Sequence, residues 1–193
     1  MGKIILGSSS PRRADILKKM KLDFDVIPSE YDEPHNQTAF SYDFVENLAY
    51  NKALDVAKKL HTENKSHFVI GADTIVVIDN QILGKPKNYQ DAEQMLKHLS
   101  GKTHFVVTGV AVVNSHNLEY NIKSDITKVF FQKRVFALLM HAFRAYDIRL
   151  CHEAIECQKR WAVKSTNSIR MIRLMMQCRP LWRLLLHLRK NLR

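Results

Sequence analysis

Three short polar segments in the first half of the chain contain residue types that suit phosphate chemistry. The first, GSSSPRR, combines small residues, a proline and two adjacent arginines. Pro11 is typical of the first turn of a helix, and Arg12 and Arg13 fall in that turn, where the helix dipole disfavours cations. A phosphate would supply the missing negative charge, because helix N-termini and arginine both bind it well. The alternative is an exposed turn with solvated arginines.

The second segment, VIGADTIVV, has a carboxylate within an apolar stretch. A buried carboxylate is costly unless it is paired or holds a metal ion. Beside phosphates, Asp73 could hold a magnesium-type ion through oxygen or take a proton from attacking water. Aspartate is also common in turns, so the functional interpretation of Asp73 depends on the segments around it.

The third segment, ILGKP, has Lys85 directly after a glycine. Two further residues are candidates for the same site. Lys52 shares a helical stripe with apolar residues, and Glu33, in the acidic turn YDEP, could be a second metal carboxylate beside Asp73. Each has a structural alternative: a solvated lysine at position 85, a snorkelling lysine at 52 and a solvated acidic turn at 33.

The elements that must position these segments alternate between strand and helix, which predicts an α/β fold with a mixed sheet flanked by helices. A capping-box spacing of Asp43 and Glu46 predicts the start of the second helix, and Asn88 is expected to cap the third. Because ligands collect at the carboxyl ends of strands, we expect the three segments to converge. The expected elements are strands at 3–6 and in FDVIPSEYDEP, helices at 11–20 and 43–59, two short strands broken at 71–73, a strand at Gln81–Leu83, a helix at Tyr89–Leu99 and a strand in HFVVTGVAVV.

Charge divides the chain into two parts. Residues 1–130 contain 16 Lys and Arg against 16 Asp and Glu, whereas residues 131–193 contain 14 against 3, so the whole net charge of +11 belongs to the last third. No apolar run approaches the length of a membrane span. We therefore expect a cytoplasmic protein without a transmembrane segment.

The quoted segments, together with ENLAYNKALDVA, closely resemble the Maf family of nucleoside triphosphate pyrophosphatases over about two-thirds of the chain. The resemblance implies an α/β fold of two lobes about a cleft. It also implies hydrolysis of a nucleoside triphosphate to the monophosphate and pyrophosphate, assisted by a divalent metal cation of the Mg or Mn type. SPRR and GADT look like the branch that acts on dTTP and UTP, rather than the branch that acts on 7-methyl-GTP.

The same resemblance implies roles for individual residues. Asp73 corresponds to the proton acceptor, and Arg12 and Thr74 occupy positions linked to the choice of nucleotide. The residues that correspond to phosphate-binding positions are Ser8, Arg12, Arg13, Lys52 and Lys85.

The resemblance stops near residue 131, and we divide the chain there into an incomplete Maf-like domain (1–131) and a divergent basic helical tail (132–193). The family continues with a segment of the form GEPxDKAGxYGIQG, which the tail lacks. A frame change or altered splice in the encoding message would explain this break. A catalytically impaired isoform or remnant that binds nucleotide weakly is then the alternative to an active pyrophosphatase.

The alternative is a functional tail. RPLWRLLLHLRKNLR has the spacing of a basic amphipathic helix for an acidic membrane or a partner protein. No nucleic-acid-binding motif accompanies the charge. The expected partner is the nucleoside triphosphate, and a homodimer is a further candidate.

Overall fold

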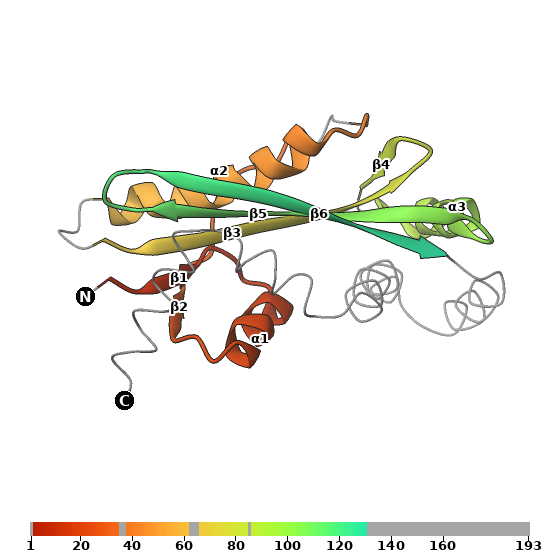
Figure 1. Ribbon diagram of the computed structural model, residues 1–193. Coiled ribbons are helices and arrows are strands. Elements are labelled where there is room, and N and C mark those ends of the chain that lie inside the picture. The colour runs from red at the N-terminus through yellow and green to blue at the C-terminus, as the bar shows by residue number, and fades with distance from the viewer. Residues whose placement is uncertain (1, 35–37, 62–65, 85, 131–193) are drawn as a thin grey trace.

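The expected alternation of strands and helices is present in the computed structural model, which describes residues 2–34, 38–61, 66–84 and 86–130. The predicted α/β class with a mixed sheet is confirmed (Figure 1). In chain order the elements are β1 (Ile4–Leu6), α1 (Pro11–Lys19), β2 (Phe24–Val26), α2 (Tyr42–Leu60), β3 (Phe68–Ile78), β4 (Gln81–Leu83), α3 (Tyr89–Leu99), β5 (Thr103–Asn114) and β6 (Tyr120–Phe130).

The sheet has six strands, and the long strand β3 lies at its centre. Five of the strands have the order β2-β1-β3-β5-β6, and the sixth, β4, also pairs with β3. β1 runs parallel to β2 and to the first part of β3, with Leu6 opposite Ile70. β4 runs antiparallel to the last part of β3, with Leu83 opposite Val76. On its other side β3 pairs along almost its whole length with β5, and β5 pairs with β6.

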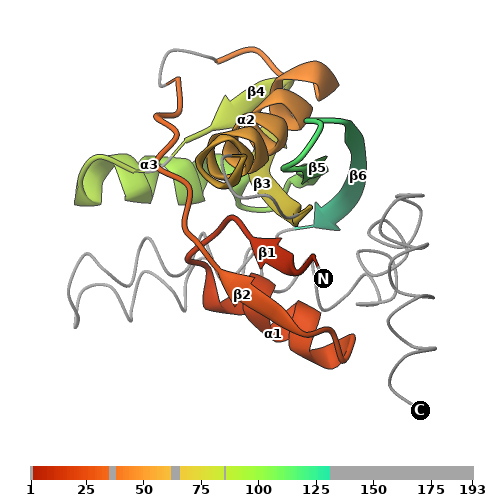
Figure 2. The same cartoon turned by 90° about the vertical axis from the view of Figure 1, so that its left-hand side faces the viewer.

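The two faces of this sheet are covered by different helices (Figures 1 and 2). On one face, Val69 of β3 and Ala111 of β5 pack with the buried residues of α2. On the other face, Ile70 packs with Leu17 of α1. Neighbouring residues of a strand point to opposite faces, so alternate side chains of β3 belong to alternate helices.

Two glycines let α2 lie directly against the sheet. A Cβ atom added to Gly71 of β3 would be 2.3 Å from the carbonyl oxygen of Ala49 and 2.6 Å from the amide nitrogen of Ala53. A Cβ atom added to Gly109 of β5 would be 2.6 Å from the carbonyl oxygen of Val45. No real Cβ atom could occupy either position, so both glycines are required by the close approach of helix and sheet.

Two local expectations from the sequence are wrong. The stretch 71–73 is not a break between two strands, because β3 continues through it without interruption. The helix α2 is capped by Ser41, whose hydroxyl accepts a hydrogen bond from the Phe44 amide, and not by Asp43 in a capping box. The Glu46 carboxylate, expected to complete that box, instead accepts a hydrogen bond from the Ser124 hydroxyl of β6 at 2.5 Å.

Other expectations hold. Asn88 caps α3 by accepting a hydrogen bond from the Asp91 amide, and β4 has the predicted bounds. Within the described residues no helix is long and apolar enough to cross a bilayer. The helical tail predicted for residues 132–193 lies outside the described residues.

The close approach of α2 predicts a strong and selective effect of added methyl groups. Gly71→Ala and Gly109→Ala should each lower the free energy of unfolding by about 2–3 kcal/mol, because overpacking forces the helix backbone away from the sheet. Gly84→Ala is the matched control, since nothing lies within 4 Å of its Cβ position. Urea unfolding of the full chain measures all three, and equal stability of Gly71→Ala and Gly84→Ala would contradict the predicted contact.

A buried histidine predicts how stability depends on pH. The His104 side chain is fully buried, with no hydrogen-bond partner for either ring nitrogen among the described residues, and burial lowers its pKa from 6.5 to about 4. Below pH 6.5 the unfolded chain therefore binds a proton that the folded chain does not. Between neutral pH and about pH 5 this should cost about 2 kcal/mol. His104→Leu should reduce that loss in urea unfolding, whereas an unchanged pH dependence would contradict this assignment.

Candidate active site

The candidate site lies where β3 changes neighbours. Its residues 68–70 pair with β1 and its residues 76–78 pair with β4. Between them, Asp73 pairs with Gly109 of β5 on one side, and on the other side no described strand pairs with it. From their registers, both β1 and β4 run toward this gap, so the carboxyl ends of two strands point to Asp73. The segments that follow those ends, beginning at Gly7 and Gly84, are the first and third polar segments of the sequence.

A compact group of three charges occupies the α2 side of the gap. The Lys52 ammonium of α2 lies 2.5 Å from Oδ1 of Asp73 and 2.7 Å from Oε1 of Glu33. Asp73 is buried and the Lys52 side chain is 12% exposed, whereas the Glu33 side chain is 39% exposed. The lysine therefore compensates a carboxylate that would be costly in this apolar strand, and it joins three segments that are far apart in the sequence.

The first polar segment reaches the same place from β1. The amide of Gly7 donates a hydrogen bond to the carbonyl of Ile70 at 2.8 Å, and a Cβ atom at Gly7 would be 3.5 Å from the carbonyl oxygen of Lys52. Ser8 follows and is buried. Its hydroxyl accepts hydrogen bonds from Nη1 of Arg13 at 2.7 Å and from the amide of Ser10 at 3.3 Å.

The arginines begin α1 as expected. The helix starts with Pro11, its first turn has no acidic residue, and the Ser10 side chain makes no capping hydrogen bond. Arg12 is exposed and Arg13 is partly buried. A positive helix end that carries two arginines is suited to an anion.

Thr74 lies on the face of the sheet that α1 covers, opposite to Lys52 and Asp73. Thr74 follows Asp73 in a continuous strand, so its side chain points away from α2. Its hydroxyl is 3.1 Å from that of Thr108 in β5, with which it pairs in register. The structure therefore does not bring Thr74 together with Lys52 and Asp73. Lys85 lies outside the described residues.

Sequence reasoning missed two contacts around the site. Thr108 is buried as the partner of Thr74, and Ser124 ties β6 to Glu46 of α2 beside Gly109. Both pairs span strands or elements that are distant in the chain. Only the sheet register could have revealed them, because neither threonine nor serine in a strand carries a distinctive local signal.

Comparison with known proteins places the chain in a family. A family model described as a Maf-like protein matches residues 3–162. The chain belongs to the Maf-like family. The matched region of this Maf-like chain extends beyond residue 131, where the sequence analysis placed the domain boundary.

Curated relatives are similar to the Maf-like chain over about two-thirds of its length. A dTTP/UTP pyrophosphatase of Acetivibrio thermocellus is 46% identical over 132 residues, which cover 67% of this chain and 66% of the relative. A dTTP/UTP pyrophosphatase of Ruminiclostridium cellulolyticum is also 46% identical over 132 residues, with 68% and 66% covered. The chain thus spans just under two-thirds of the length of these relatives. A solved nucleoside-triphosphatase of Mycobacterium abscessus has 15% identity and a TM-score of 0.44, covering 68% of this chain and 75% of that one.

The oxygen atoms at the Maf-like site suit a divalent cation as part of a ligand set. Within the described residues no group of three or more histidine, cysteine or acidic side chains could hold a metal ion. Mg²⁺ commonly uses only one or two carboxylates and completes its shell with water and substrate phosphates. Glu33 and Asp73, which already share one cation in Lys52, fit that smaller role.

The ion pair predicts a specific pattern of stability. Lys52→Met should lower the free energy of unfolding by about 2–3 kcal/mol, because it leaves the buried Asp73 carboxylate unpaired. Adding Asp73→Asn should restore part of that loss, since the double variant has no buried charge. The control is Lys3→Met, which removes an exposed pair with Asp25 and should cost less than about 1 kcal/mol. Strictly additive losses for positions 52 and 73 would contradict the coupling.

Proposed function

We propose that the chain hydrolyses nucleoside triphosphates of the dTTP and UTP class to the nucleoside monophosphate and pyrophosphate. The observation that carries this proposal is the buried Asp73 carboxylate, held by Lys52 in the gap of β3. The carboxyl ends of β1 and β4 point to that gap, and the segment after β1 begins a helix with two arginines. The names of the two relatives support the choice of nucleotide.

The residues divide into phosphate binding and proton transfer. The positive start of α1, with Arg12, Arg13 and the Ser8 hydroxyl, would bind the phosphate chain. Lys85 would add a charge from the segment after β4. One oxygen of Asp73 accepts from Lys52, which leaves the other to take the proton from the attacking water as the new P–O bond forms and pyrophosphate leaves.

A divalent cation of the Mg or Mn type belongs to the proposal. Glu33 and Asp73 would hold it together with phosphate oxygens, and when bound it would neutralise charge on the phosphates. Without the divalent cation, Lys52 keeps the Glu33 and Asp73 carboxylates close to one another. A role of Thr74 in the choice of nucleotide stays a prediction, because Thr74 lies on the other face of the sheet. The cytoplasmic location and the homodimer also stay predictions.

A catalytically impaired isoform is the second candidate. It rests on the divergent composition after residue 131, and no contact in the described residues favours it. A weakly binding protein would retain the phosphate contacts at α1 while releasing no pyrophosphate, so product measurement separates the two functions.

The proposed reaction predicts both products and one essential residue. With dTTP or UTP and Mg²⁺, the full chain should release pyrophosphate and monophosphate in equal amounts. Asp73→Asn should reduce that rate by about 10²–10⁴-fold, the usual contribution of a positioned general base. Asp79→Asn is the control, because Asp79 lies in the β3–β4 turn and is exposed. Release of orthophosphate, or full activity of Asp73→Asn, would contradict the proposal.

A further inference from the structure

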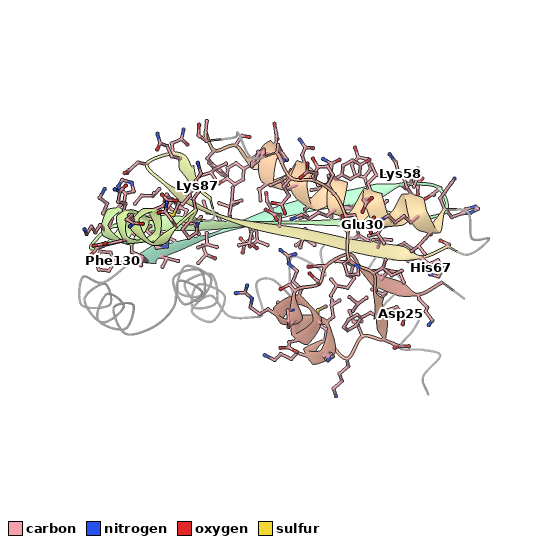
Figure 3. The ribbon with its side chains drawn as sticks, turned by 180° about the vertical axis from the view of Figure 1, so that it is seen from behind. Asp25, Glu30, Lys58, His67, Lys87 and Phe130 are labelled. Carbon is pink, nitrogen blue, oxygen red and sulfur yellow. The ribbon has the colours of Figure 1, made fainter. Side chains whose placement is uncertain are left out.

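The acidic segment between β2 and α2 is attached along one side of α2 by side-chain contacts. The Ser29 hydroxyl donates to Oδ2 of Asp55 at 3.0 Å, and the amide of Glu30 donates to the same oxygen at 2.8 Å. The Glu30 carboxylate lies 2.7 Å from Nζ of Lys59. Figure 3 shows Glu30 on the α2 side of the molecule.

The helix residues that hold this segment form a single row. Asn51, Asp55 and Lys59 are spaced four residues apart, which places them on one face of a helix. Asn51 continues the row toward the site by donating from Nδ2 to the Tyr31 hydroxyl at 3.3 Å. The segment therefore runs antiparallel to α2.

Asp55 is the central member of this row. Its Oδ2 atom accepts from both Ser29 and Glu30, and it lies 3.5 Å from Nζ of Lys59. Partial burial by itself would raise the pKa of Asp55. The hydrogen bonds from Glu30 and Ser29, together with Lys59, outweigh that effect and hold the pKa below its ordinary value. The charged form of Asp55 is therefore the form that anchors the segment.

The anchor and the candidate site are connected by a very short length of chain. Glu33 follows Glu30 by three residues, a span of at most about 10 Å, and its carboxylate contacts Lys52 at 2.7 Å. Lys52 lies close to the row that holds Asp55, on the same helix. With Glu30 tied to Asp55, Glu33 has little freedom to move away from Lys52 and Asp73.

We propose that Asp55 is a positioning residue, which acts through the Ser29–Glu33 segment to hold the Glu33 carboxylate at Lys52 and Asp73. The proposal rests on the proposed pyrophosphatase function for its catalytic consequence. Asp55 itself makes no hydrogen bond or ion pair with Lys52 or Asp73 among the described contacts, so any effect on catalysis must pass through the segment.

The anchor is tested without nucleotide by hydrogen exchange of the full chain. Asp55→Asn should accelerate exchange of the amides of residues 29–33 by about tenfold, most directly that of Glu30, because a neutral amide oxygen replaces the charged acceptor of its hydrogen bond. Ser29→Ala removes the hydrogen bond from the Ser29 hydroxyl to Asp55, together with the one that this hydroxyl accepts from the Tyr31 amide, and should act in the same direction. Asp43→Asn, an identical change on the first turn of α2, should leave exchange of residues 29–33 unchanged. Equal exchange in all four proteins would overturn the proposal.

The catalytic consequence is tested by a double-mutant cycle on pyrophosphate release from dTTP. Asp55→Asn should lower kcat/KM by about tenfold in the wild-type background and cause almost no further loss in the Glu33→Gln background, because residues that act through one another are not additive. Equal losses in both backgrounds would overturn the proposal. A wild-type chain that releases no pyrophosphate, with faster exchange in Asp55→Asn, would contradict the proposed function while supporting the anchor.

Discussion

The close contact between α2 and the sheet is the constraint on which the candidate site depends. Gly71 and Gly109 leave no room for side chains beneath the helix, so the helix backbone lies directly over β3 and β5. At this distance the Lys52 ammonium reaches Asp73 on the sheet. A helix displaced from the sheet would weaken this ion pair, and a buried carboxylate without a partner is costly. The two glycines therefore allow both the close packing of α2 and the ion pair between Lys52 and Asp73.

The second determinant is that β3 is continuous while its neighbours are not. β1 and β4 pair with opposite ends of β3 and leave Asp73 between them. The carboxylate therefore lies in a strand that pairs with β5 on one side. On the other side, β1 and β4 end toward it, at Leu6 and Leu83. Sites that bind small molecules are commonly built from the loops that a fold holds in place beside its strands.

Much of this arrangement could be predicted from the sequence, and the remainder could not for identifiable reasons. Strand and helix periods located most elements. As expected, the strands that precede the first and third polar segments both end toward Asp73. The Gly71–Ala72–Asp73 stretch resembled a strand break because glycine and aspartate are turn formers, but glycine there accommodates a helix. The roles of Ser124 and Thr108 depend on strand register, and that of Asp55 on a segment from another part of the chain. Local sequence patterns contain no information about strand register or about contacts between distant segments.

The most direct test of the central claim, that Lys52 bridges Glu33 and Asp73 beneath a closely packed helix, is an NMR measurement of lysine ammonium groups in the ¹⁵N-labelled full chain. The account predicts that the Lys52 ammonium exchanges its protons with water far more slowly than those of exposed lysines such as Lys18, because its side chain is largely shielded and is held by two carboxylates. Slow exchange should be lost in Gly71→Ala, in which the helix is displaced. An ammonium of Lys52 that exchanges as fast as that of Lys18 in the unmodified chain would contradict the account.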